Sequence, residues 1–150
     1  MDLTLAGKTI LITGATQGLG AEIAREAARR GVAALALAGR SAENGARVAA
    51  EIRSHGAEAR HFPADLALPE APAALFRAVA AWRGRVDGLV NAAGITDRAS
   101  ILDGSLDDWE RLFALNARAP FFLMQAAIRA AVAAGPPASI VNILSMNAHC

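Results

Sequence analysis

The chain has 150 residues, of which 54% are apolar and 19% are charged, and its formal net charge is +1. This length can bury the core of one domain, and the near-zero net charge argues against a nucleic-acid-binding role. No run of eighteen uncharged apolar residues indicates a membrane span, and the N-terminus lacks the basic segment of an export signal. The single cysteine, Cys150, cannot form an internal disulfide, so we expect a cytoplasmic protein without nucleic-acid or membrane partners.

Short apolar runs typical of buried strands alternate with helical segments along the chain. The runs are Lys8–Thr13, Ala33–Ala38, Ala57–Phe62, Val86–Asn91 and Ser139–Leu144. Because these runs are continuously apolar, each strand is predicted to be covered on both faces, as in a parallel sheet between helices. Glycines 31, 56 and 84 follow turns with a basic residue or histidine and predict helix C-terminal ends. The sequence therefore predicts an α/β, doubly wound parallel sheet, with residues 1–150 forming a single domain.

A glycine-rich segment, Thr13-Gly14-Ala15-Thr16-Gln17-Gly18-Leu19-Gly20, lies between the first apolar run and the helical run Ala21–Arg30. Its glycines permit a tight turn and let a ligand approach the backbone closely. The helix that follows points unpaired N–H groups and its positive dipole end at the same place. The segment is predicted to bind phosphate, although glycines also serve ordinary strand-to-helix turns.

Polar or glycine residues also follow the other four predicted strands. In a doubly wound sheet, a ligand lies outside the carboxyl ends of the strands. We therefore expect the functional site along this edge. The four segments are Gly39-Arg40-Ser41, Ala64-Asp65-Leu66, Asn91-Ala92-Ala93-Gly94 and Ser145-Met146-Asn147.

The order and spacing of these motifs resemble the short-chain dehydrogenase/reductase family. The spacing Gly-x-x-x-Gly-x-Gly at 14, 18 and 20 is followed by Asp65, Asn91–Gly94, Asn116 and Ser145, so the resemblance spans Lys8 to Ser145. It implies a Rossmann fold with strand order 3-2-1-4-5, without the family's C-terminal strands. It also implies an oxidoreductase that transfers a hydride between NADP(H) and a carbonyl or secondary alcohol.

The resemblance assigns most cofactor-binding positions. The three glycines, with the backbone of Thr16, Gln17 and Leu19, would hold the pyrophosphate. Asp65 and Leu66 would bind the adenine, the alternative for Asp65 being an N-cap of a helix that starts at Leu66. Asn91, Ala92 and Gly94 would form a small floor for the nicotinamide ribose, with Ala92 in place of the family's second asparagine. Together these implied cofactor-binding residues are Gly14, Thr16, Gln17, Gly18, Leu19, Gly20, Asp65, Leu66, Asn91, Ala92 and Gly94.

The end of the second strand bears on the choice of cofactor. An acidic residue there would bind the 2′-hydroxyl of NAD and repel a 2′-phosphate. Here Gly39 carries no charge, and Arg40 supplies a planar donor fork suited to phosphate. The sequence therefore predicts NADP as cofactor, with NAD possible if Arg40 only stacks on adenine or lies in solvent.

The resemblance also assigns two catalytic residues and leaves two unassigned. Ser145 matches the serine that polarises the substrate oxygen, and Asn116, in a predicted helix Leu106–Ala117, matches the asparagine that holds a water on a proton path. The family's Tyr-x-x-x-Lys pair would follow Ser145, but the chain contains no tyrosine. No spacing of His, Cys and carboxylate residues predicts a metal site.

The missing acid–base pair leaves two functions open. The chain is either the N-terminal portion of a longer enzyme or a catalytically inactive dinucleotide-binding or regulatory protein. As a 150-residue chain alone, we expect it to bind dinucleotide weakly without turnover. A nucleotide- or adenosylmethionine-binding transferase is disfavoured by the positions of Ser145 and Asn116.

The long apolar run Leu106–Ala134, interrupted by Pro120, resembles the family's long interface helix. It implies a homodimer or homotetramer in the full-length protein. A small-molecule carbonyl or alcohol is the expected substrate.

Overall fold

The five predicted strands form one parallel sheet in the computed structural model, which describes residues 4–97 and 99–145. The strands are β1 (Thr9–Thr13), β2 (Ala34–Gly39), β3 (Glu58–Pro63), β4 (Gly88–Asn91) and β5 (Ser139–Asn142). They lie in the order β3-β2-β1-β4-β5, and every neighbouring pair is parallel. The predicted fold class and strand order are confirmed.

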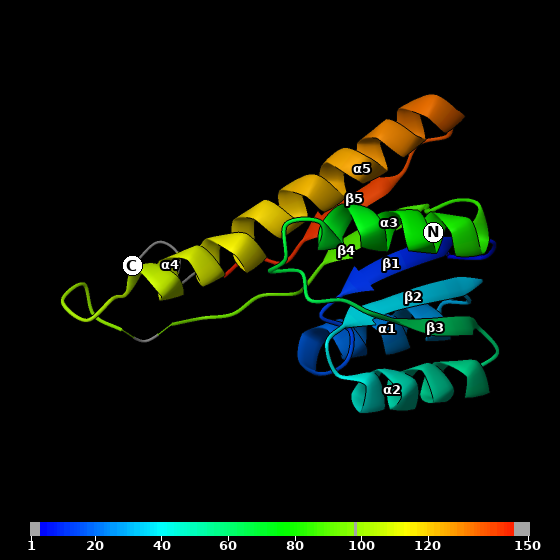
Figure 1. The fold of residues 1–150 in the computed structure, drawn as a ribbon. Coiled ribbons are helices and arrows are strands. Elements are labelled where there is room, and N and C mark those ends of the chain that lie inside the picture. The colour runs from blue at the N-terminus through cyan, green and yellow to red at the C-terminus, as the bar shows by residue number, and fades with distance from the viewer. Residues whose placement is uncertain (1–3, 98, 146–150) are drawn as a thin grey trace.

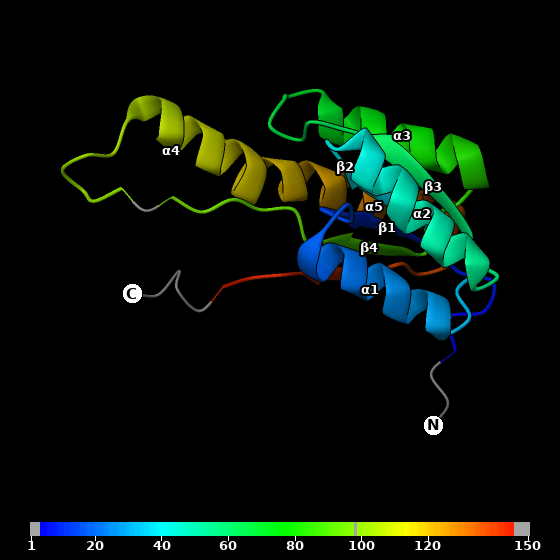
Figure 2. The same cartoon turned by 90° about the horizontal axis from the view of Figure 1, so that it is seen from below.

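Helices cover both faces of the sheet (Figure 1). On one face lie α1 (Gly18–Arg29) and α2 (Ala42–Ser54), and on the other lie α3 (Ala71–Arg83) and α5 (Ala119–Ala134). A short helix, α4 (Leu106–Phe113), and a π-helical segment, η1 (Ala114–Arg118), precede α5. Figures 1 and 2 both show α4 projecting beyond the sheet, at the end where β1 finishes.

The apolar character of the strands follows from this double cover. Along β2, Leu35 and Leu37 pack in a cluster with α1 and α2, whereas Ala36 and Ala38 pack in a cluster with α3 and α5. All four side chains are fully buried. Successive residues of a strand point to opposite faces, so a strand covered on both faces needs an apolar residue at every position.

The predicted helix ends are also confirmed. Gly31, Gly56 and Gly84 follow or cap α1, α2 and α3 with φ angles of +73°, +89° and +73°. This left-handed conformation is one that glycine adopts without the steric cost of a Cβ atom.

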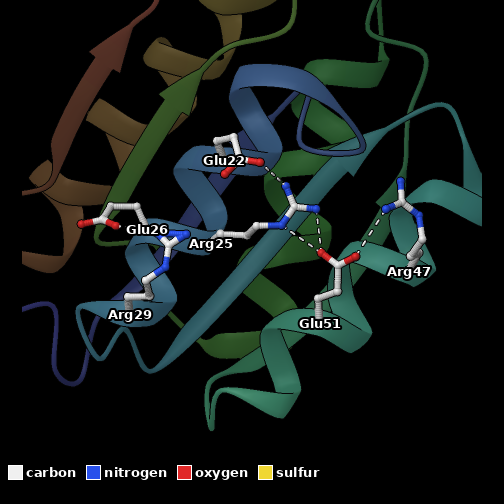
Figure 3. Close-up of polar contacts among 6 residues, drawn as sticks. All are labelled: Glu22, Arg25, Glu26, Arg29, Arg47 and Glu51. Carbon is white, nitrogen blue, oxygen red and sulfur yellow. Dashed lines mark hydrogen bonds and ion pairs between the residues drawn. The ribbon is translucent and has the colours of Figure 1, made fainter.

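Arg25 joins α1 to α2 through an ion-pair network (Figure 3). Its guanidinium donates to Glu51 from Nε at 2.9 Å and from Nη2 at 2.6 Å, and to Glu22 from Nη1 at 2.6 Å. This hydrogen bonding with Arg25 holds the pKa of the Glu51 carboxyl below its usual value, and the bonds from Arg29 and Arg30 do the same for Glu26.

The segment from α4 to α5 differs from the prediction at Pro120. Pro120 does not interrupt the helix: it follows the π-segment η1 directly, and Arg118 and Ala119 before it keep helical dihedral angles. The α-helix predicted for Leu106–Ala117 instead ends at Phe113 and continues as the π-segment η1. Among the described residues, no helix combines the length and the hydropathy needed to cross a bilayer.

The fifth strand is shorter and more exposed than the others. The predicted run to Leu144 ends as a strand at Asn142, and Val141 and Leu144 are 49% and 88% exposed. β5 therefore leaves an apolar surface uncovered among the described residues of this chain.

Candidate cofactor-binding site

The predicted phosphate-binding segment forms a turn that leads directly into α1. Gln17 is the N-cap of α1 but makes no side-chain capping bond, and the first turn carries no acidic residue. Gln17, Gly18 and Leu19 are exposed. The first N–H groups of α1 are thus directed outward with no side chain of their own helix to neutralise them, which is the arrangement that accepts an anion.

Each of the three positions in the turn requires glycine for a different structural reason. Gly18 has a φ of +54°, and a Cβ there would meet nothing within 4 Å, so the space above it is open to a ligand. A Cβ at Gly20 would collide with the carbonyl oxygen of Gly14, within the turn itself. Gly20 therefore has a structural role, because its missing side chain allows the turn to close.

Gly14 and Thr13 join the turn to the end of β4. A Cβ at Gly14 would lie 2.8 Å from the carbonyl oxygen of Ala92 and 2.9 Å from the Cα of Ala93. The buried Thr13 accepts hydrogen bonds through Oγ1 from the backbone N–H groups of Ala92 and Ala93, each at 3.1 Å. The sequence assigned Thr13 no role, although it is a polar residue at the end of a buried strand and begins the glycine-rich segment.

The end of β2 packs against the same turn. A Cβ at Gly39 would lie 2.6 Å from Cγ2 of Thr16, a side chain that is itself buried. The next residue, Arg40, is exposed, and no hydrogen bond or ion pair fixes its guanidinium within residues 4–97 and 99–145. Ser41 then caps α2 by accepting from the N–H of Asn44 at 3.2 Å. The structure thus places a free cation beside the glycine turn.

Asp65 does not cap a helix, so the capping alternative is wrong. Its Oδ1 accepts from the N–H of Ala67 at 3.1 Å in a local turn, and the next helix, α3, begins only at Ala71. Leu66 is buried. Arg118 of η1 donates from Nη2 to the carbonyl oxygen of Ala67 and so holds this loop from the opposite side.

Asn91 is the most buried polar residue at the end of β4, with 6% of its surface exposed. Its Nδ2 donates to Oδ1 of Asn142 on β5 at 2.8 Å. Its Oδ1 is buried without a partner among the described residues. A buried oxygen of this kind fits a hydroxyl donor, such as the ribose that the resemblance implies here.

Asn116 lies in η1, where its amide oxygen and its amide nitrogen both bond to the backbone of one residue. Its Oδ1 accepts from the N–H of Ile95 at 3.0 Å, and its Nδ2 donates to the carbonyl oxygen of Ile95 at 2.8 Å. Gly94 is close, since a Cβ there would lie 3.3 Å from Oδ1. The polar residue in this apolar helix therefore fixes the loop after β4, and π-segments of this kind are frequent at functional sites.

Ser145 lies just beyond the strand that neighbours Asn91. The N–H of Ile143 donates to the carbonyl oxygen of Asn91 at 2.9 Å, and Ser145 follows two residues later, exposed. Met146, Asn147 and Cys150 lie outside the described residues. Within the described part of the chain, no three His, Cys, Asp or Glu side chains gather as metal ligands.

The comparisons with known proteins agree with this arrangement. The family model for short chain dehydrogenases matches residues 8–150. The short-chain dehydrogenase/reductase FrzI of Cladobotryum sp. is 36% identical over 146 residues, which cover 97% of this chain and 55% of the relative.

Two solved structures resemble the fold closely. A putative short-chain alcohol dehydrogenase from Sinorhizobium meliloti superposes with a TM-score of 0.92 at 32% identity, over 99% of this chain and 58% of the other. A blue fluorescent protein from a metagenomic library, in complex with NADPH, gives 0.87 at 34% identity, over 97% and 59%. The chain thus spans somewhat more than half the length of its relatives. With its sheet order, glycine turn and matching family model, the chain belongs to the short-chain dehydrogenase/reductase family of oxidoreductases.

Proposed function

We propose that the protein is an NADP(H)-dependent oxidoreductase acting on a carbonyl or secondary alcohol. The observation that carries the cofactor preference is the pair Gly39 and Arg40. Thr16 fills the space that a side chain at Gly39 would need, so this position cannot present a carboxylate to a ribose 2′-hydroxyl without displacing Thr16. Arg40 beside it is exposed and free to pair with a 2′-phosphate. The structural relative bound to NADPH supports the same choice.

The remaining groups of the cofactor have matching positions along the sheet edge. The N–H groups at the start of α1, above Gly18, would bind the pyrophosphate. Asp65 and the backbone of Leu66 would bind the adenine, and the buried Oδ1 of Asn91 would accept from the nicotinamide ribose. The bound nicotinamide supplies the hydride donor or acceptor.

Ser145 and Asn116 would act on the substrate side. The Ser145 hydroxyl donates a hydrogen bond to the substrate oxygen and stabilises its developing negative charge during reduction. Asn116 holds the loop after Gly94 through Ile95 and, in our proposal, lies on the proton path to solvent. Because the sequence contains no tyrosine, none of these residues is assigned as the general acid, and the 150-residue chain alone is expected to bind dinucleotide weakly without turnover.

Self-association of the full-length protein is part of the proposal. α4 and α5 expose large apolar side chains that a second copy would cover. These side chains, exposed by 41% to 80%, are Leu106, Trp109, Phe113, Phe121, Phe122, Ile128 and Val132. Light scattering should give a dimer or tetramer, and a monomer at working concentration would contradict this.

The test of the activity is NADPH oxidation by the full-length protein with a panel of aldehydes and ketones. We expect turnover, and Ser145→Ala should lower kcat by about a hundredfold or more with little change in cofactor Kd. Binding of NADPH without turnover on any substrate would instead favour an inactive, regulatory dinucleotide-binding protein.

A further inference from the structure

The loop that carries Arg40 is fixed by a histidine from another strand. His61 lies on β3, where it pairs with Leu37 of β2, and its side chain faces α2. Its Nε2 lies 3.0 Å from the carbonyl oxygen of Gly39. Because a carbonyl oxygen only accepts, the neutral ring must carry its hydrogen on Nε2.

The same ring also contacts the first turns of α2. A Cβ at Gly45 would collide with the imidazole, so the ring occupies the space that any other residue at position 45 would fill. Gly45 belongs to the turn that follows the Ser41 cap, since its N–H donates to the Ser41 carbonyl oxygen at 3.0 Å. His61 therefore touches the backbone on both sides of Arg40: the end of β2 and the start of α2.

Gly39 makes two further contacts. Its carbonyl oxygen also accepts a hydrogen bond from the N–H of Ala64 at 3.2 Å, and its Cα faces the side chain of Thr16. The backbone before Arg40 is thus held by two other segments of the chain: the end of β3, through His61 and Ala64, and the glycine turn, through Thr16. Within residues 4–97 and 99–145, no hydrogen bond or ion pair holds the Arg40 side chain.

We propose that His61 is a positioning residue for NADP selectivity, fixing the backbone from which Arg40 meets the 2′-phosphate. The inference rests on the proposed NADP preference. A preorganised Arg40 loses less freedom on binding the phosphate than one on a loose loop, so the effect falls on NADP and not on NAD. His61 itself contacts no cofactor atom in this proposal.

The test uses Kd values of the full-length protein for NADP and for NAD, measured by calorimetry. His61→Phe keeps an aromatic ring against Gly45 but removes the donor, and Gly45→Ala displaces the ring. Each should raise the Kd for NADP about three- to tenfold and that for NAD by less than about twofold, the size expected for one hydrogen bond. His55→Phe, at the exposed far end of α2, is the matched control and should change neither.

Arg40→Ala separates this inference from the proposed function. If Arg40→Ala leaves the ratio of the two Kd values unchanged, the 2′-phosphate assignment itself is wrong. The role of His61 is overturned if Arg40→Ala abolishes the preference while His61→Phe raises the Kd values for NADP and NAD equally or changes neither. When His61→Phe is combined with Arg40→Ala, it should have no further effect on the ratio of the two Kd values. An additive effect would also count against positioning through Arg40.

Discussion

Replacing Gly14 by alanine is expected to destabilise the protein even without cofactor. Gly14 has a φ of +67°, and a left-handed alanine costs about 1–2 kcal/mol. Its new Cβ would lie 2.8 Å and 2.9 Å from backbone atoms of Ala92 and Ala93, which cannot rotate away. Such overpacking costs about 1–3 kcal/mol more. The total of about 3 kcal/mol corresponds to a fall in Tm of about 6–12 °C for a protein of this size class.

Gly31→Ala is the matched control for this experiment. Gly31 has a similar φ of +73°, but a Cβ there would meet nothing within 4 Å. Gly31→Ala should therefore lower the free energy of unfolding only by the cost of a left-handed alanine, about 1–2 kcal/mol. Urea unfolding of both variants without ligand measures the difference. Equal destabilisation would refute the close approach of the glycine turn to the end of β4.

Three further predictions concern Gly18, Thr13 and Glu51. Gly18→Ala should destabilise the protein without cofactor about as much as Gly31→Ala does. It should also weaken NADP binding at least about tenfold, because the new Cβ points into the space proposed for the pyrophosphate, and an unchanged Kd for NADP would contradict that placement. Thr13→Val should cost about 1–3 kcal/mol in urea unfolding, since two partly buried backbone N–H groups lose their acceptor, and a loss under about 0.5 kcal/mol would oppose this. Because Arg25 lowers the pKa of folded Glu51, their bond stabilises at neutral pH and is lost as the pH falls below the ordinary pKa of a glutamate. The Tm difference from Glu51→Gln should therefore shrink in acid, and a pH-independent difference would argue against it.

Much of the fold could be predicted because local signals agree with the tertiary structure. Apolar runs identified the strands, and glycines after basic residues or histidine identified three helix ends. The expectation of continuously apolar strands fails at the edge strand β3, where Glu58 and Arg60 are exposed and alternate with buried residues. Strand order came from the resemblance and not from the residues, since pairing in a parallel sheet depends on distant contacts. The strand boundaries shifted by a residue or two, as at the first strand, which begins at Thr9 and not at Lys8.

Neither the π-segment η1 nor the start of α3 at Ala71 could be predicted from the sequence. The change in helical register at η1 is stabilised by Asn116 bonding to Ile95, twenty-one residues away, so no local period reveals it. The alternative for Asp65, an N-cap of a helix that starts at Leu66, fails because a turn intervenes before α3. In both places a polar side chain serves the backbone of a loop and not a helix end.

Contacts that fix the site were the hardest to foresee. Thr13, His61 and Arg118 each bond a backbone group from another segment, and the sequence assigned none of them a role, although Thr13 begins the glycine-rich segment. A polar residue on a buried strand or in an apolar helix was the only available signal.

The most direct test of the central claim is the ratio of the Kd for NAD to the Kd for NADP in the full-length protein, measured with and without Arg40→Ala. Because Arg40 is exposed beside a position that has no room for a carboxylate, we predict that the wild type binds NADP at least about tenfold more tightly than NAD. Arg40→Ala should remove most of this preference by weakening NADP alone. Equal or tighter binding of NAD by the wild type, or an equal loss for both cofactors in Arg40→Ala, would contradict the account.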